Sequence, residues 1–393
     1  MQHLHCKKYI IGLFGLMLIG ASPAASQLTN TSAGAFLRYG AGTAALSVGQ
    51  AFTAAAHDPS AVYWNPAGLV QVRDYQWLFS SSQLPFERTF RFAAFNLPLT
   101  GYQNLGFGWL GLTISGLEAR RNNTPEPDYL FSDSENAFFF SYSRRLRSDL
   151  LLGGSVKLLY MKLASKQGMG ASVDAGLLYK PFDTLRLGLS LQNIGSAINW
   201  SGGYREFIPL QLRLGLVYRL MPNLLLLTDL ASGLDSGFKL FMGAQLKVLP
   251  NLPLRLGFGP QGPAAGVAIH FLYNRTQWAL DYGIHQDAIS GNLVHQFSLK
   301  FTLKKKAPNM PLAQKPRPSR KRGIPFFETI EVDTELLNVR SGPGIQYKVI
   351  DQVRQGERYK KMEQIGLWVK IRTRSGKIGW VHSSYVVLVT AAN

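Results

Sequence analysis

The 393 residues include a single cysteine, Cys6, and it stands before an apolar run at residues 9–20. A basic start, that run and the small residues of ASPAAS are typical of a cleaved secretory signal peptide over residues 1–26. A retained membrane anchor is the alternative, but the run is short for a spanning helix. Cleavage near residues 24–26 would leave an exported chain without cysteine, which excludes disulfides and thiol chemistry.

Long apolar runs and charge are also scarce. No stretch of 18 or more apolar residues follows residue 26, which excludes helical membrane spans from the rest of the chain. Only 17% of residues are charged, whereas 46% are hydrophobic and 39 are glycine. The formal net charge is +19, but residues 304–322 alone hold eight Lys and Arg and no acid. The basic character therefore belongs largely to that short segment.

The sequence shows no convincing reaction centre. Its seven histidines form no HExxH or other metal-ligand spacing, and its acids form no pair that the sequence can bring together. Gly257, Gly259 and Gly262 match GxGxxG, but Pro260 and Pro263 disfavour the helix that a nucleotide site needs, so an outward loop is expected. We expect no enzymatic activity, no cofactor, no metal site and no nucleic-acid partner.

What dominates residues 75–303 is an alternation of period two, which predicts β-strands with one apolar and one polar face. Residues 185–192 illustrate it, because leucines at the odd positions alternate with Arg186, Gly188, Ser190 and Gln192. Residues 211–219 and 277–285 follow the same pattern. We expect roughly fourteen strands, most of 9 to 12 residues.

The connections between these strands fall into two classes. Short turns such as RLRSD and KPFDT alternate with longer loops, notably at residues 115–135 and 195–206. This asymmetry is typical of an outer-membrane barrel with tight periplasmic turns and longer outward loops. A soluble sandwich or lipocalin-like barrel is the alternative, but it accounts poorly for the two classes of connection and the export signal. The polar faces would then line the barrel interior, with candidate lumen residues Asp174, Arg186, Arg213, Arg219, His270 and Asp281.

Residues 304–325 cannot continue a sheet, because they hold five prolines and the basic run. They predict an extended linker, for which a plain spacer is favoured over binding to an acidic surface. Residues 326–389 form a separate small all-β module with turns at Gly342-Pro343-Gly344 and Ser375-Gly376-Lys377.

The segment before the first strand, FLRYGAGTAALSVGQAFTAAAHDPSAVYWNPAGL, resembles the start of the PorV/PorQ group of outer-membrane proteins. It is more distantly similar to FadL-type long-chain fatty-acid transporters. The resemblance implies that residues 27–74 form a hatch inside a fourteen-stranded barrel. The positions that match its motif are Asp58, Asn65, Pro66, Ala67 and Gly68, whereas His57 replaces a common acidic residue.

The C-terminal module resembles the bacterial Src-homology-3-type (SH3-type) domains of cell-envelope proteins. The matching residues are Leu337–Arg340, Ser341–Gly344, Trp368, Gly379-Trp380-Val381 and Tyr385. Such domains bind peptidoglycan or other proteins, and this resemblance implies that exposed aromatic residues contact the ligand. The candidate wall-ligand contacts are Tyr347, Trp368, Trp380 and Tyr385.

These features predict an all-β protein: a barrel of about fourteen strands with an N-terminal plug, in the outer membrane, and a periplasmic SH3-type domain. The leading functional interpretation is transport of hydrophobic or amphipathic small molecules, with membrane lipid and peptidoglycan as partners. A PorV-like accessory barrel that handles secreted or envelope proteins is the rival interpretation. A cell-wall-associated protein targeted by its SH3-type domain is a third, and a wall hydrolase is disfavoured because the sequence shows no catalytic set.

Overall fold

The computed structural model describes residues 34–123, 125–233, 236–274, 276–304 and 328–389. The chain divides into two compact units, Met1–Pro308 and Asn309–Asn393, which are taken separately below. The predicted signal peptide lies outside the described residues, as does the predicted linker apart from Lys304. Among the helices of the described part, none combines the length and hydropathy that crossing a membrane requires.

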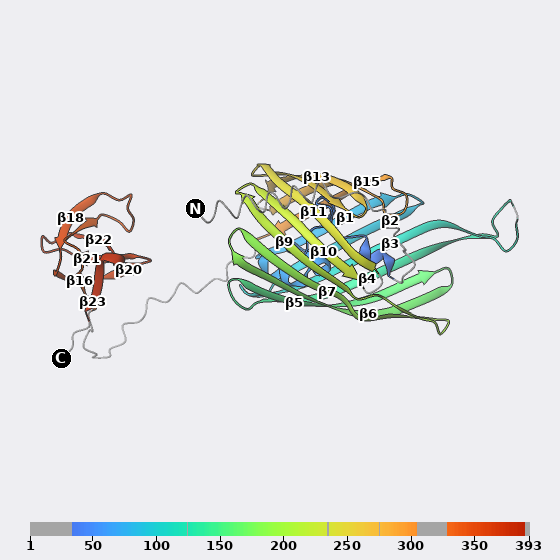
Figure 1. Cartoon of the computed structure of the whole chain (residues 1–393), viewed down its shortest axis with the longest axis horizontal. Coiled ribbons are helices and arrows are strands. Elements are labelled where there is room, and N and C mark those ends of the chain that lie inside the picture. Colours follow the sequence, from blue (N-terminus) through green and yellow to red (C-terminus); the bar gives the residue numbers. More distant parts are fainter. Residues whose placement is uncertain (1–33, 124, 234–235, 275, 305–327, 390–393) are drawn as a thin grey trace. The chain divides into compact units, whose positions relative to one another are not determined.

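In the first unit, fourteen antiparallel strands close into a barrel, because β1 pairs with both β2 and β15 (Figure 1). A short additional strand, β8 (Arg205–Phe207), pairs only with β7. This arrangement confirms the predicted all-β fold and the count of fourteen. The barrel strands are β1 (Tyr75–Leu84), β2 (Arg88–Pro98), β3 (Gln103–Ala119), β4 (Tyr129–Arg145), β5 (Leu150–Leu163), β6 (Lys166–Phe182), β7 (Leu185–Trp200), β9 (Gln211–Met221), β10 (Leu224–Gly233), β11 (Ser236–Leu249), β12 (Leu252–Gly259), β13 (Gly262–Tyr273), β14 (Thr276–Gln286) and β15 (Leu293–Leu303).

Several strands are longer than the alternation suggested. Strands β3, β4 and β6 each have 17 residues, because hydrogen-bonded pairing continues past the barrel wall. The expected long loops at 115–135 and 195–206 are therefore wrong at their flanks, which are strand: β3 and β4 pair up to Ala119 and Tyr129, and β7 runs to Trp200. The β3–β4 hairpin consequently extends beyond the other strands of the barrel (Figure 1).

The outward face of the barrel is apolar. Exposed side chains such as Phe140, Leu158, Leu214 and Phe271 alternate along their strands with buried inward residues. At the end where the chain enters and leaves the barrel, Trp77, Phe95 and Phe301 stack with ring centroids 4.6 to 4.7 Å apart. An apolar outer band flanked by aromatic rings is the surface of a barrel that spans a bilayer.

Residues 34–74 fold into short helices inside the barrel, and we call this segment the plug. It contains η1 (Ala35–Arg38), α2 (Thr43–Ser47), α3 (Ala61–Trp64) and η2 (Pro66–Gln71). Alanine and glycine are its commonest residues, and such small residues pack tightly in a narrow space. Pro66 starts η2 because its fixed φ suits the first helical position and it has no N–H to leave unpaired.

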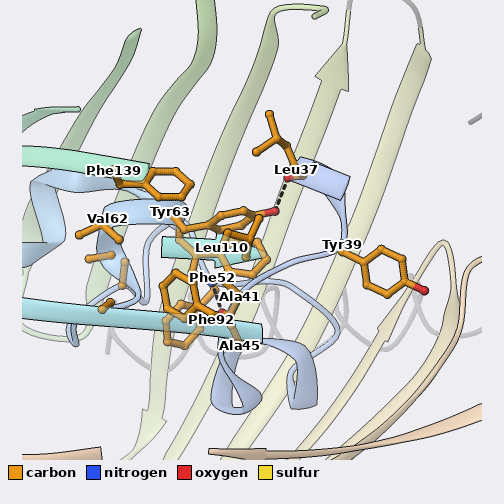
Figure 2. Packing of buried hydrophobic residues seen from close by; sticks show 14 of the residues in the cluster. Leu37, Tyr39, Ala41, Ala45, Phe52, Val62, Tyr63, Phe92, Leu110 and Phe139 are labelled. Atoms are coloured by element: carbon orange, nitrogen blue, oxygen red, sulfur yellow. Dashed lines mark hydrogen bonds between the residues drawn. The ribbon is translucent and has the colours of Figure 1, made fainter. Parts of the chain in front are cut away.

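The core of this unit lies between the plug and the wall. Trp64 is fully buried, and the rings of Tyr63 and Phe139 meet edge to face at 6.2 Å. Figure 2 shows the Tyr63 hydroxyl donating to the Leu37 carbonyl, at 2.5 Å. Burying a large apolar side chain contributes about 1.5–3 kcal/mol, so this shared core stabilises the plug and the barrel together.

The second unit is a small all-β domain with two sheets. One has the order β19-β16-β23 and the other β18-β17-β22-β21-β20. Its core includes Val339, Ile371 and Val381, all fully buried. The elements are β16 (Thr329–Val332), β17 (Leu336–Arg340), β18 (Val349–Arg354), β19 (Arg358–Lys360), β20 (Glu363–Ile365), β21 (Trp368–Arg372), β22 (Ile378–His382), η3 (Ser383–Tyr385) and β23 (Val386–Val389).

Candidate functional site

The corner Asn65-Pro66-Ala67-Gly68 attaches the plug to the barrel wall. The Asn65 side chain caps η2 by accepting from the Ala67 N–H at 3.2 Å. Its amide nitrogen lies 3.1 Å from the Leu177 carbonyl of β6 and 3.3 Å from the Leu189 carbonyl of β7. Asn65 is fully buried, so these bonds replace water that its amide would otherwise hold.

A belt of inward glycines lets the plug approach the wall. A Cβ added at Gly257 would lie 2.0 Å from the Gly49 nitrogen, and one at Gly153 would lie 2.4 Å from the Ala67 nitrogen. The glycine belt spans nine strands, and at every position an added Cβ would fall within 2.8 Å of a plug atom. Its members are Gly106, Gly108, Gly153, Gly176, Gly188, Gly215, Gly243, Gly257, Gly266 and Gly283.

This belt was not predicted from the sequence. The signal was present, since Gly188, Gly215 and Gly283 each fall on the polar face of an alternating strand. Glycine inside a strand weakens it and often marks a place where another backbone comes close. The plug therefore occupies space that side chains would otherwise fill.

An ion pair on the wall clamps the middle of the plug. Arg213 of β9 lies 3.2 Å from Asp229 of β10 and donates to the Gln50 carbonyl at 2.7 Å. The same Asp229 oxygen accepts from the backbone N–H groups of Phe52 and Thr53, at 3.1 and 2.9 Å. Both charged side chains are almost fully buried, so each depends on the plug and on its partner for compensation.

A second cluster, at the opposite end of the barrel from Tyr75 and Leu303, holds the start of the plug. Arg88 pairs with Asp287 at 2.7 Å, and the Tyr39 hydroxyl donates to the other Asp287 oxygen. Burial acts to raise the pKa of Asp287, but bonds from Tyr39, Ser290 and Arg88 outweigh it and lower the pKa to about 2. Burial, and then Asp287, raise the pKa of Tyr39, so its hydroxyl stays a donor.

Asp58 attaches the plug at the other end of the barrel, close to where β15 ends. Its carboxylate accepts from the Ser60 N–H at 3.0 Å and lies 3.6 Å from Lys300 of β15. Burial acts to raise the pKa of Asp58, but Lys300, His57 and Ser60 together lower it. The charged carboxylate therefore attaches the plug to β15 as well.

The six candidate lumen residues separate into two groups. Asp174, Arg213 and Asp281 are buried, and each is ion-paired, with Lys157, Asp229 and Arg255 respectively. These side chains are therefore paired within the barrel, and a role for them in lining a solute path stays a prediction.

The other three, Arg186, Arg219 and His270, alternate with outward residues near the end where the chain enters the barrel. His270 lines a cavity of about 370 Å³ there with Gln76, Lys300 and Thr302. A role for these three side chains in solute passage stays a prediction.

The SH3-type unit has a groove of about 380 Å³. Trp368 and His382 meet edge to face at 5.1 Å, and Tyr385 lies 5.9 Å from the His382 ring. Arg340 shapes one border by donating to the carbonyls of Ile345 and Tyr347, each at 2.9 Å. The lining residues are Thr334, Leu336, Leu337, Asn338, Arg340, Ile345, Trp368, His382 and Tyr385.

Only two of the four candidate contacts line this groove, Trp368 and Tyr385. Trp380 is 7% exposed and packs inside the domain, so its expected place among the exposed contacts is wrong. Tyr347 is exposed, but its ring lies over Gly342 outside the groove. Within the described ranges, no three His, Cys, Asp or Glu side chains gather as a metal site would require.

Residues 335–387 match the family described as the bacterial SH3 domain, which confirms the SH3-type prediction for this module. The putative N-acetylmuramoyl-L-alanine amidase YrvJ of Bacillus subtilis (strain 168) is 46% identical over 52 residues. That alignment covers 13% of this chain and 10% of YrvJ, so the chain spans about a tenth of the length of this relative.

The chain is also similar, at low identity, to solved structures of two toluene transporters and a FadL homologue. The toluene transporter TbuX of Ralstonia pickettii is 12% identical with a TM-score of 0.48, over 67% of this chain and 98% of that chain. A FadL homologue of Pseudomonas aeruginosa has the same values. The toluene transporter TodX of Pseudomonas putida is 13% identical with a TM-score of 0.48, over 67% and 97%. The fourteen-strand assignment rests on this chain's own hydrogen-bonded register.

Proposed function

We propose that this chain is an outer-membrane barrel that passes hydrophobic or amphipathic small molecules, and that its plug controls the passage. The observation that carries the proposal is the plug itself, a segment of small residues seated against the glycine belt and held by three polar attachments. A structural filler needs none of these buried charges, because an apolar core of the same volume is as stable or more stable. Ion pairs and hydrogen bonds of this kind can break and re-form when the plug changes position.

The proposal places the SH3-type unit in the periplasm, where it binds peptidoglycan through the Trp368–Tyr385 groove. Aromatic side chains with a nearby arginine are the usual centres of binding energy in such grooves. The unit's likeness to part of an amidase supports a ligand in the cell wall. We propose no enzymatic activity for the chain, and the groove acts as an anchor.

A second candidate, a barrel that receives exported proteins, is favoured by the β3–β4 hairpin. Its outer part carries Tyr129 and Leu130, which are 53% and 63% exposed. Exposed apolar side chains on a projecting hairpin suit a protein partner better than a solute.

A deletion strain separates the two candidates. Deletion should reduce uptake of a hydrophobic dye such as N-phenyl-1-naphthylamine and leave the set of surface-displayed proteins unchanged. Re-expression of the full chain should restore uptake. Unchanged uptake together with loss of displayed proteins would replace transport with the secretion role.

A further inference from the structure

The outward face of the barrel carries a groove of about 570 Å³ that crosses six neighbouring strands, from β3 through β2, β1, β15 and β14 to β13. It lies on the outside because its side chains alternate with inward ones: Ser298 bonds the plug residue Thr43, so Phe297 and Leu299 point outward. The lining is mostly apolar and includes Phe79, Ser81, Ala93, Trp109, Leu280 and Phe297.

Small residues between large ones make this groove. Ser81 pairs with Phe297 of β15, and Ala93 pairs with Trp109 of β3, so short side chains stand beside rings on both sides. The groove walls remain open to the surroundings, since Phe79 is 46% exposed and Phe297 is 60% exposed. In a bilayer, a hollow of this kind is filled by hydrocarbon.

Two charged residues, Arg91 and Asp281, line the groove, but Asp281 is buried and already ion-paired with Arg255. Arg91 lies on β2 directly opposite Ser81, on the outward face. The Arg91 guanidinium makes no hydrogen bond or ion pair with any residue in the described ranges. An arginine on the lipid face of a barrel costs about 2–4 kcal/mol at the bilayer midplane and about 0–1 near the interface, so an unpaired one calls for a partner in the membrane.

The position of Arg91 fits a lipid headgroup. It lies three residues from the start of β2 at Arg88, next to the β1–β2 turn. A rise of about 3.4 Å per residue and a tilt of about 40° place it about 8 Å below the end of the strand, in the interfacial layer. Tyr282 also lines the groove, but its hydroxyl already lies 2.7 Å from His295 Nδ1. The Arg91 guanidinium is therefore the charged donor that can bind a headgroup.

We propose that this groove holds an acyl chain of a phosphate-bearing membrane lipid and that Arg91 binds its phosphate. A guanidinium presents paired N–H donors that match two phosphate oxygens, and the interface screens such a pair less than bulk water does. The apolar groove alone would accept any hydrocarbon. The guanidinium selects a lipid whose headgroup is anionic. The proposal rests on the barrel lying in a membrane and is independent of transport.

Native mass spectrometry of the full chain in detergent tests this lipid site, with dioleoylphosphatidic acid as the probe. Dioleoylglycerol has the same acyl chains without the phosphate, and inorganic phosphate supplies the anion without the chains. Phosphatidic acid should give retained adducts, dioleoylglycerol about tenfold fewer, and millimolar inorganic phosphate should not compete.

Variants assign the site. Arg91→Gln should reduce phosphatidic acid adducts about tenfold, and Arg91→Lys should restore part of the loss. Ala93→Trp should abolish retention while Arg91 remains, because it fills the groove. Arg144→Gln is the matched control, since Arg144 is an exposed outward arginine of β4 outside the groove. Equal retention of the two lipids, or equal losses in Arg91→Gln and Arg144→Gln, would overturn the proposal.

Discussion

Glycines on the inward face decide how closely the plug approaches the wall. Gly153 and Gly154 are neighbours on β5, but they face opposite sides. A Cβ at Gly153 would overlap the backbone of Pro66 and Ala67, whereas the nearest atom to one at Gly154 is 3.7 Å away. This pair isolates the effect of the belt from any effect on strand formation.

Gly153→Val should therefore displace the plug and destabilise the folded barrel by about 1–3 kcal/mol or more, as overpacking of a core does. Gly154→Val should change stability little, because its side chain enters the outward face. Thermal unfolding in detergent, with limited proteolysis of residues 34–74, measures both effects. Equal behaviour of the two variants would remove the belt from the account.

The Arg88–Asp287–Tyr39 cluster predicts that the plug becomes less stable at acid pH. Asp287 has a pKa of about 2 in the folded protein, lowered from an unfolded value of about 3.9. The stability that the Asp287 carboxylate contributes is therefore present at pH values above its unfolded pKa, and it is lost as the pH falls through its folded pKa. The wild-type plug should stay protected from protease at pH 5–8 and loosen between about pH 4 and pH 2.

Asp287→Asn should be less stable at neutral pH and should loosen less than the wild type through this window, because only other plug carboxylates such as Asp58 remain to be protonated. A wild-type protein whose plug loosens between pH 8 and pH 5 would contradict the assignment of the pH effect to Asp287.

At the scale of elements, the alternation of leucines with polar residues over 185–192 was enough to predict β7 and the face that it turns inward. The plug's path was not predictable in the same way. Its attachments join Thr43 to Ser298 and Tyr39 to Asp287, and such distant pairs leave no local pattern in one sequence. The buried state of Trp380 was missed for a related reason, since an aromatic residue on a short strand can face either side.

The SH3-type domain should fold when residues 326–389 are expressed alone, because its core is made within the domain. It should cosediment with purified peptidoglycan, and Tyr385→Ala should weaken cosedimentation about tenfold or more. Tyr347→Ala is the matched control, an exposed tyrosine outside the groove. Circular dichroism verifies folding. A folded domain that stays in the supernatant would remove wall binding.

For the whole molecule, the apolar outer band predicts recovery with outer membranes and only with detergent. A closed barrel should also run faster on unheated gels than on boiled ones, because its hydrogen-bonded wall resists unfolding until heated. Recovery as a detergent-free periplasmic protein would contradict a barrel in the membrane.

The central claim is that solutes pass only when the plug moves. The Thr43 and Ser298 hydroxyl oxygens lie 2.6 Å apart, one on the plug and one on β15, so cysteines at these two positions would bring their sulfur atoms together. Ser141 and Ser155 also bond each other, but both belong to the wall, on β4 and β5. The sequence offers no cysteine after Cys6 to compete with either engineered pair.

The most direct measurement is dye uptake by cells that carry Thr43→Cys with Ser298→Cys, before and after a reductant. The account predicts little uptake while this disulfide is intact, recovery to the wild-type rate on reduction, and no dependence on reductant for Ser141→Cys with Ser155→Cys. Uptake that is equally fast with the plug cross-linked to β15 would contradict it.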